Sequence, residues 1–362
     1  MYEPPKYLAW AIANYTGVKF DLATSGMLPF PIADLANALA LTALDDPSGW
    51  ERLRAAIARY NDVPEVECIA ALGAAHALWL AYAALTSPGD DILVEEPAYE
   101  PLLRAAAGVG ARVVRFKRDP EQGFALDPAA IARAMTPRTR LVAVTNLHNP
   151  SGVRTSDDVL REIARIVAER QAYLLVDEVY APFDELVSDD GVLRGSARRL
   201  GANVVCASSL TKCYGLGANR FGWLTGPREA IAHAEATILS TCGMLPLSHA
   251  NLAVAAFAHV PVLAARARGI LAGKRALVEA WARSRPEIAW SSPTAGLFGF
   301  ARMPGRPDLL AAIEKGIAEH EVIVAPGSFF EMPEGFRLGW GGIAIESLPE
   351  ALTRLEKALG LA

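Results

Sequence analysis

The sequence predicts a two-domain α/β protein whose larger domain is built around a mostly parallel sheet. Between about residues 73 and 226, short apolar runs alternate with longer helical stretches. Runs that are nearly continuous in hydrophobicity are typical of strands covered by helices on both faces, and their alternation with helices indicates a parallel sheet. The chain has 362 residues, more than a single core usually supports, so a second domain is expected.

Six apolar runs are the predicted strands of the large domain. They begin at Asp91, Arg112, Arg140, Ala172, Asn203 and Phe221. Ahead of them, residues 68–89 contain no Asp, Glu, Lys or Arg, and a membrane-spanning helix needs about 20 mainly apolar residues. Gly73, His76 and Pro88 interrupt this segment. It is therefore predicted to be a buried core helix, and no membrane association is expected.

The sequence pattern changes after about residue 246. A long helical stretch rich in Ala, Arg and Leu runs to about Arg285, turn-rich sequence follows, and a last helix is predicted from Leu348 to Leu359. These elements predict a smaller domain, which the first forty or so residues join. The expected division places residues 45–245 in the large domain, and residues 1–44 and 246–362 in the small one.

Composition and charge exclude several classes of protein. Hydrophobic residues make up 52% of the chain and charged residues 21%, which favours a buried core over disorder. The net charge of -5 without a long basic run argues against a nucleic-acid partner. The four cysteines lack paired spacing, so neither disulfides nor a metal site is expected. No secretory signal is visible, and a cytoplasmic location is expected.

Residues 208–223 are the most informative segment for chemistry. Lys212 follows a predicted buried strand and precedes a run of glycines. Lysine is rarely buried, and desolvation lowers its pKa and makes the amine a nucleophile. Ser209, Thr211 and Arg220 form a hydroxyl and guanidinium cluster suited to a phosphate. A surface turn with a solvated lysine is the structural alternative.

Two rival motifs overlap this segment, and each of them is incomplete. The spacing from Ser209 to Lys212 matches the S-x-x-K of serine β-lactamases, but the S-D-N and K-T-G motifs of that class are missing. Gly215 and Gly217 suggest a dinucleotide loop, but Arg220 occupies the position of its third glycine. No G-x-S-x-G nucleophile elbow occurs in the chain.

Two further motifs follow predicted strands. Asn149-Pro-Ser-Gly152 comes directly after one apolar run, where an ordinary turn is the alternative interpretation. Asp177 ends another run and precedes Tyr180 by three positions. A helix N-cap is the alternative for Asp177. Ligands of open α/β sheets bind beyond the carboxyl ends of the strands, so all these side chains are expected at one site.

Taken in chain order, these motifs resemble the cofactor site of the class I/II aminotransferases, the aspartate-aminotransferase-like group of the fold-type I pyridoxal-phosphate (PLP) enzymes. The resemblance implies a large domain with a mostly parallel seven-stranded sheet, a smaller α+β domain, bound pyridoxal 5'-phosphate and a homodimer. It rests on Asn149-Pro-Ser-Gly, Asp177-x-x-Tyr180, Ser209-x-x-Lys212 and Arg220. Weaker similarity extends to residues 49–60, 72–76, 97–99, 324–329 and 336–338.

The resemblance also implies a role for each residue around the cofactor ring. Lys212 would hold the cofactor as a Schiff base and then move the substrate Cα proton. Asp177 would keep the pyridine nitrogen protonated, which makes the ring an electron sink. Tyr180 and Asn149 would hydrogen-bond the ring oxygen, and Tyr99 would stack on the ring face.

Phosphate and substrate contacts are implied in the same way. The phosphate would lie on the Ala74 and Ala75 amides at a helix start, with Ser209 and Arg220 completing its shell. Substrate contacts are implied for four residues, of which Arg337 would grip the carboxylate through two parallel hydrogen bonds. The other three are Asn149, Ser25 and Gly26.

Two departures from the family pattern bear on function. Many relatives place a tyrosine shortly before the glycine equivalent to Gly49, where it reaches the partner's phosphate, but residues 44–48 contain none. Aspartate-specific relatives use a second arginine for the distal carboxylate, and residues 239–249 contain none. A dicarboxylic substrate is therefore not expected.

The expected reaction is transfer of an amino group from a small amino acid to a 2-oxo acid. The same site could support other PLP chemistry on amino acids, because the pocket selects the bond that breaks. The alternatives in that class are a C-S or β-lyase, a racemase, a decarboxylase and a cyclising synthase. A non-catalytic PLP-binding sensor is a remote alternative, since the chain has no appended DNA-binding domain.

Overall fold

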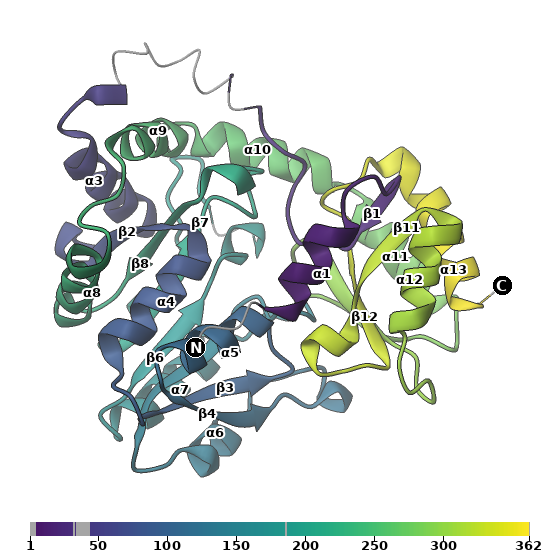
Figure 1. Cartoon of the computed structure of the whole chain (residues 1–362), viewed down its shortest axis with the longest axis horizontal. Coiled ribbons are helices and arrows are strands. Elements are labelled where there is room, and N and C mark those ends of the chain that lie inside the picture. The colour runs from purple at the N-terminus through teal and green to yellow at the C-terminus, as the bar shows by residue number, and fades with distance from the viewer. Residues whose placement is uncertain (1–4, 32, 34–43, 185–186, 362) are drawn as a thin grey trace.

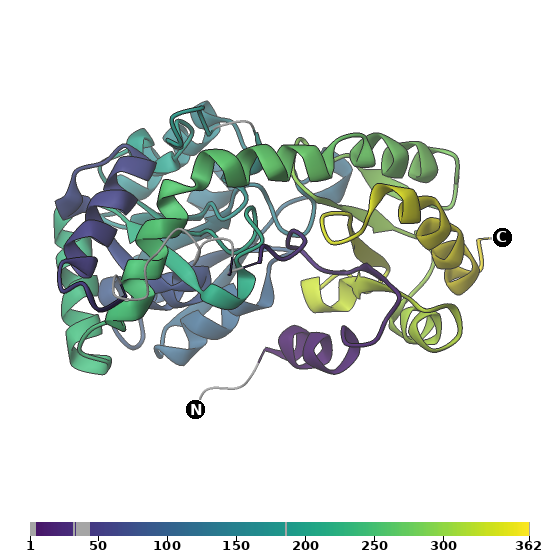
Figure 2. The same cartoon turned by 90° about the horizontal axis from the view of Figure 1, so that it is seen from above.

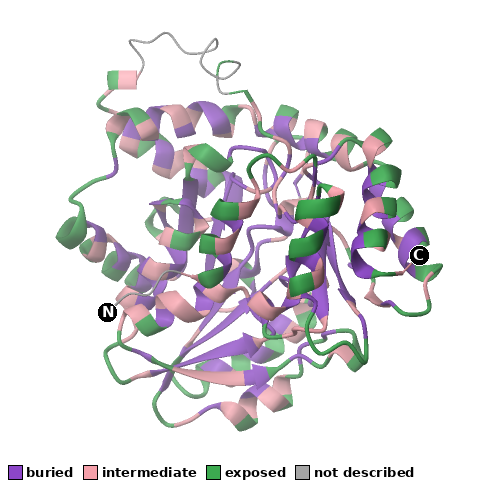
Figure 3. Ribbon diagram, turned by 45° about the vertical axis from the view of Figure 1, so that its right-hand side comes forward, coloured by how far each residue is buried: buried purple, intermediate pink, exposed green. Residues whose placement is uncertain are grey.

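Two sheets organise the molecule, and the long helix α10 (Val260–Leu271) runs alongside both (Figures 1 and 2). The computed structural model describes residues 5–31, 33, 44–184 and 187–361. Figure 3 shows that the strands are mostly buried, whereas the outer faces of the helices are exposed. This arrangement confirms the α/β class predicted from the sequence.

The larger sheet has seven strands in the order β2-β8-β7-β6-β5-β3-β4. Strand β8 runs antiparallel to both of its neighbours, and the other pairings are parallel. All six predicted strands are confirmed, so the sheet is mostly parallel as expected. The bounds are β2 Cys68–Leu72, β3 Asp91–Glu96, β4 Arg112–Lys117, β5 Thr139–Thr145, β6 Tyr173–Asp177, β7 Val204–Ser209 and β8 Phe221–Thr225.

One sequence prediction about helices is wrong, and another is confirmed with breaks. The run from Cys68 to Gly89 is not one helix, because its first five residues form β2, which pairs with β8 along its whole length. Gly73, at a φ of +80°, ends that strand and begins α4 (Gly73–Leu85). The stretch after residue 246 is helical to Arg283 as predicted, but it is divided at His259 and at the αL residue Gly273 into α9 (Leu247–Ala258), α10 and α11 (Lys274–Arg283).

Helices cover the large sheet on both faces. One apolar core joins the sheet to α4, α5 and α8, and a second joins the opposite face to α6 and α7. Because both faces are covered, the strands are apolar along nearly their whole length. The remaining helices of this part are α3 (Gly49–Asn61), α5 (Glu100–Gly108), α6 (Pro128–Ala134), α7 (Asp157–Ala168) and α8 (Arg228–Thr241).

The smaller sheet has five strands in the order β1-β11-β12-β10-β9. The N-terminal strand β1 (Phe20–Leu22) pairs with β11 (Val322–Pro326), so the chain's beginning joins its C-terminal part. The proposed boundaries near residues 45 and 245 stay a prediction, and residues 34–43 lie outside the described residues. The other elements are α1 (Lys6–Asn14), β9 (Ala289–Ser291), β10 (Phe298–Arg302), α12 (Leu310–His320), β12 (Gly335–Gly339) and α13 (Leu348–Leu359).

Within the described ranges, no single helix is both long enough and apolar enough to span a bilayer. The pair Leu247–Ala258 and Val260–Arg283 passes by length and composition alone, but it is bent by 65°.

Candidate active site

Several of the predicted site residues lie at the carboxyl edge of the large sheet. Thr145, Asp177 and Ser209 are the last residues of β5, β6 and β7. Thr145 lies directly opposite Asp177 in the register of β5 and β6. Parallel strands present their carboxyl ends at a common edge, and the segments that carry Asn149 and Lys212 begin there.

Lys212 is partly buried and lies beside the N-terminal segment of the chain. Its Nζ donates a hydrogen bond to Ser25 Oγ at 3.3 Å, so the structure brings these two predicted residues together. Burial, together with the nearby charges of Arg337 and Arg220, lowers the pKa of Lys212 to about 8. This amine is therefore partly unprotonated near neutral pH, as a nucleophile requires. The alternative of a solvated lysine on a surface turn therefore does not fit the structure.

Asp177 is a buried carboxyl group in the same site, with 4% of its surface exposed. Burial raises the pKa of Asp177 to about 7, and the negative charges of Glu95 and Glu178 add to the rise. The backbone N–H of Val179 donates to Asp177 Oδ1 at 3.2 Å, and this hydrogen bond opposes the rise in pKa. A raised carboxyl pKa next to a lowered amine pKa is typical of functional sites.

Arg337 lies on β12 of the smaller sheet and is fully buried. Its Nη1 donates to Asn149 Oδ1 at 2.7 Å, and its Nη2 donates to the Tyr7 hydroxyl at 2.7 Å and to the Ala23 carbonyl at 3.0 Å. All three acceptors are neutral, and Nε has no partner among the described residues. A buried guanidinium without a carboxylate is costly, so this position is suited to an anionic ligand.

The start of α4 forms a compact turn against Arg220. Gly73 has a φ of +80°, which favours glycine, and a Cβ atom there would also press on the Arg220 guanidinium. Ala74 and Ala75 follow in the first helical turn, where backbone N–H groups lack helical acceptors and the helix dipole is positive. Ser209 Oγ lies 2.7 Å from Thr211 Oγ1. Helix starts of this kind bind phosphate groups.

The remaining predicted residues surround these groups. Tyr180 is 3% exposed and packs its ring at 4.8 Å, edge to face, on Phe298. Tyr99 is partly buried at the start of α5, with its ring centroid 6.4 Å from that of Tyr7. Gly26 follows Ser25, and its carbonyl packs against Gly341. The structure therefore brings Lys212 together with Ser25 and Arg337 together with Asn149, and the roles of the other predicted residues stay a prediction.

Sequence reasoning missed several residues of this site. Tyr7 contacts Arg337 although 330 positions separate the two residues in the chain, and no local motif marks it. Glu95, Arg118 and Thr145 form a buried network beneath Asn149. Glu95 ends a predicted strand, where a charged side chain would ordinarily be exposed.

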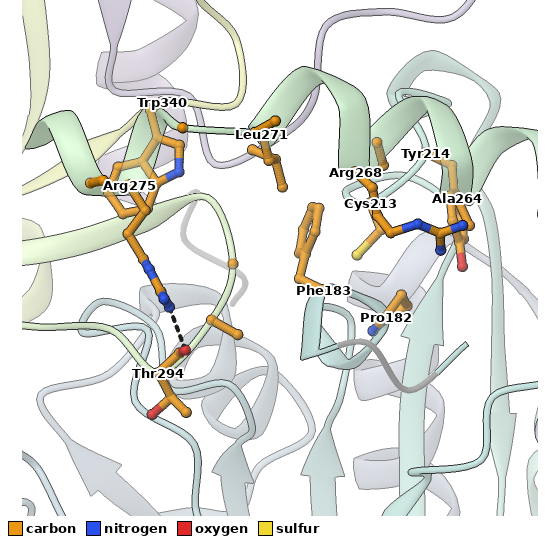
Figure 4. A pocket seen from close by; sticks show the side chains of 16 residues that line it. Pro182, Phe183, Cys213, Tyr214, Ala264, Arg268, Leu271, Arg275, Thr294 and Trp340 are labelled. Atoms are coloured by element: carbon orange, nitrogen blue, oxygen red, sulfur yellow. Dashed lines mark hydrogen bonds between the residues drawn. The ribbon is translucent and has the colours of Figure 1, made fainter. Parts of the chain in front are cut away.

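A separate cavity of about 570 Å³ lies beside α10 (Figure 4). Its lining includes Phe183, Cys213 and Trp340, but not Lys212 or the other site residues. Arg275 Nη1 crosses part of it and donates to the Thr294 carbonyl at 2.6 Å. Cys213 directly follows Lys212 in the chain, so the cavity lies next to the site.

Comparison with known proteins gives consistent matches over most of the chain. Residues 34–355 match the family model described as aminotransferase class I and II. Capreomycidine synthase from Streptomyces vinaceus is 32% identical over 365 residues, which cover 97% of this chain and 92% of that protein. Aspartate/prephenate aminotransferase from Thermus thermophilus is 29% identical over 350 residues, which cover 90% of this chain and 86% of that protein.

Solved structures show the same fold. A PLP-dependent aminotransferase from Streptococcus suis superimposes with a TM-score of 0.87 at 22% sequence identity. The match covers 99% of this chain and 98% of that one. The seven-stranded sheet and the smaller sheet are therefore arranged as in fold-type I enzymes.

Proposed function

Because the chain belongs to the class I and II aminotransferase family, whose members depend on pyridoxal phosphate, we propose that it transfers the amino group of a small amino acid to a 2-oxo acid. The observation that carries this proposal is Arg337, a fully buried guanidinium that has only neutral acceptors. Its positive charge also lowers the pKa of the Lys212 amine. A substrate that brings both a carboxylate and an amino group satisfies the two residues together.

The residues present fit pyridoxal phosphate. The buried Asp177 carboxyl, with its raised pKa, gains a counter-charge from a protonated pyridine nitrogen. Gly73 and Arg220 form a turn at a helix start that suits a phosphate. The lowered pKa of Lys212 suits a Schiff base. When bound, the cofactor supplies an electron sink for the bond broken at the substrate Cα.

Each side chain then has a role in this site. Lys212 would hold the cofactor, and its free amine would move a proton at the substrate Cα. Asp177 would keep the pyridine nitrogen protonated, and Tyr99 would stack on the ring. Asn149 uses Oδ1 to accept from Arg337, so its Nδ2 is left to donate to the ring oxygen. Tyr180 would donate to the same oxygen.

Phosphate and substrate are held at opposite ends of the site. We assign the phosphate to the Ala74 and Ala75 amides, Ser209 and Arg220. At the substrate end, the carboxylate is assigned to Arg337 and Asn149. The segment of Ser25 and Gly26 borders the substrate, because Ser25 contacts the Lys212 amine.

Replacing Arg337 with alanine is expected to raise KM for the amino acid by roughly 10²-fold, because two charge-assisted hydrogen bonds are lost. Arg337→Lys keeps the charge but loses the paired geometry, so its KM is expected to lie between those of the wild type and Arg337→Ala. Steady-state kinetics measure both values. Arg165→Ala, on the exposed ion pair with Glu162, is the control. An unchanged KM in Arg337→Ala would remove the carboxylate assignment.

A homodimer is proposed for the active form. In the single chain, Arg220 and Ala75 at the phosphate end are exposed, as expected if a second subunit covers them. A partner would also supply the phosphate contact for which residues 44–48 contain no tyrosine. Light scattering is expected to give the mass of two 38.6 kDa chains. A monomeric mass in active enzyme would contradict the proposal.

Cyclisation is the second candidate reaction. Capreomycidine synthase matches nearly the whole chain at 32% identity, and residues 239–249 contain no arginine for a distal carboxylate. A synthase would break and form bonds within one amino acid and would need no 2-oxo acid acceptor. The two reactions therefore differ in whether a 2-oxo acid is needed to return the cofactor to its starting form.

Absorbance spectroscopy of the purified enzyme separates these reactions. The lysine Schiff base is expected to give a visible band, which an amino acid donor bleaches and a 2-oxo acid restores. A panel of amino acids with and without 2-oxo acids identifies the donor. A band that shifts without a 2-oxo acid requirement would instead favour the cyclising synthase or another lyase-type reaction.

A further inference from the structure

A buried ion pair lies beneath the loop that carries Asn149. Glu95, on β3, is fully buried, and Arg118 is 1% exposed. Arg118 Nη1 lies 2.7 Å from Glu95 Oε2. The attraction within a buried pair often only balances the cost of removing both charges from water. Stability alone is therefore a weak reason for the pair, and the geometry that it imposes becomes the more informative feature.

Both ions are tied to neighbouring backbone and hydroxyl groups. Glu95 Oε1 accepts from the Thr145 N–H at 2.8 Å and from the Thr145 hydroxyl at 2.6 Å. On the other side, Arg118 Nε donates to the Phe124 carbonyl at 2.7 Å, and Arg118 Nη2 donates to Thr155 Oγ1 at 3.2 Å. Hydrogen bonds to ionised groups are short and strong, so the pair fixes Thr145 at the end of β5.

Thr145 in turn fixes Asn149. The Thr145 hydroxyl oxygen accepts the Asn149 N–H at 3.0 Å while its proton points to Glu95. A hydroxyl that donates to a charged acceptor becomes a better acceptor itself. Asn149 then accepts from Arg337 at 2.7 Å. One continuous chain of contacts therefore leads from the buried ion pair to the guanidinium assigned to the substrate.

We infer that Thr145 is a positioning residue. Its hydroxyl links the Glu95–Arg118 pair to Asn149, and so holds Asn149 and, through it, Arg337 in place. The inference rests on the proposed function, in which Asn149 contacts the cofactor ring and Arg337 the substrate carboxylate. Thr145 itself touches neither ligand. Its hydroxyl is needed because only a group that donates and accepts at once can join Glu95 to the Asn149 N–H.

The test is Thr145→Val, which removes the hydroxyl at nearly constant shape and leaves both ions in place. We expect KM for the amino acid to rise about tenfold, because small displacements of a binding group are costly. The pH midpoint of the Schiff-base absorbance is expected to rise by about 0.5–1 unit, because the Asn149 hydrogen bond to the anionic ring oxygen weakens. If Thr145→Val does not fold, Thr145→Ala takes its place.

Two matched variants separate positioning from stability. Thr145→Ser keeps a hydroxyl and is expected to restore both the KM and the pH midpoint. Thr139→Val alters the other end of β5, where a 1% exposed threonine accepts from the Thr136 N–H at 2.8 Å. That variant is expected to lower the melting temperature while leaving the KM and the pH midpoint unchanged.

The outcomes are distinguishable from those of the proposed function. A wild-type KM and pH midpoint in Thr145→Val, with only a lower melting temperature, would overturn the inference and leave the function intact. So would a failure of Thr145→Ser to restore them. If the wild-type protein shows no Schiff-base band, the proposed function fails before any variant is compared, and the inference falls with it.

Discussion

Replacing Lys212 with alanine is expected to abolish the Schiff-base absorbance and to reduce turnover by roughly 10⁴-fold. The variant loses both the amine that attaches the cofactor and the base that moves the Cα proton, and a positioned base alone contributes up to about 10⁴-fold. The lowered pKa of Lys212, about 8, makes it the amine best suited to both steps. Stopped-flow absorbance and steady-state turnover measure the two losses separately.

Lys212→Arg is the matched comparison for this prediction. It keeps a positive charge in the site but cannot form a Schiff base, because its guanidinium stays protonated. It is therefore expected to lack both the band and the turnover, as Lys212→Ala does. Lys19→Ala, at an exposed lysine, is expected to behave as the wild type. Retained turnover in Lys212→Arg would show that charge alone explains the role of this residue.

Asp177→Asn is expected to reduce turnover by roughly 10³-fold, yet to stabilise the cofactor-free protein at alkaline pH. Turnover falls because the pyridine nitrogen loses its charged partner, a preorganised electrostatic contact. Stability rises because burial raises the pKa of Asp177 from 3.8 to about 7, so its ionised form is unfavourable in the folded protein. The variant therefore exchanges function for stability, as substitutions in active sites often do.

The pH dependence of this stabilisation has a definite sign. The folded-state pKa of Asp177 exceeds its unfolded value. The contribution of this group to the stability of the wild-type apoprotein is therefore fully present below about pH 4 and is lost as the pH rises through 7. The advantage of Asp177→Asn is thus expected to be absent at pH 4 and to reach at most about 4 kcal/mol at pH 8. Urea unfolding of both apoproteins measures it. An advantage of equal size at both pH values would contradict the assigned cause.

Much of the fold follows from local sequence patterns. The six predicted strands are continuous apolar runs bounded by polar residues, and burial on both faces of the sheet produces that pattern. β2 was missed because Cys68–Leu72 merges with the apolar start of α4. Its strand conformation depends on pairing with β8, some 150 positions away, which no local pattern records.

From residue patterns alone, the site was predictable where its residues follow strands, whereas Arg337 and Ser25 came only from the family resemblance. Asn149, Asp177 and Lys212 come just after or at the ends of β5, β6 and β7, and the topology brings those ends together. Tyr7 could not be inferred in this way, because α1 reaches Arg337 only through the folding of the N-terminal segment onto the small sheet. Thr145 was unremarkable in sequence, since its role depends on an ion pair contributed by two other strands or their ends.

Borohydride reduction followed by peptide mass spectrometry tests the central claim most directly. The reagent converts a Schiff base into a stable secondary amine, so it marks the lysine that holds the cofactor. We expect a single phosphopyridoxyl group on the peptide that contains Lys212, and none in Lys212→Arg. Labelling at another lysine, or no labelling of protein incubated with pyridoxal phosphate, would contradict the assignment of Lys212 and the catalytic site built around it.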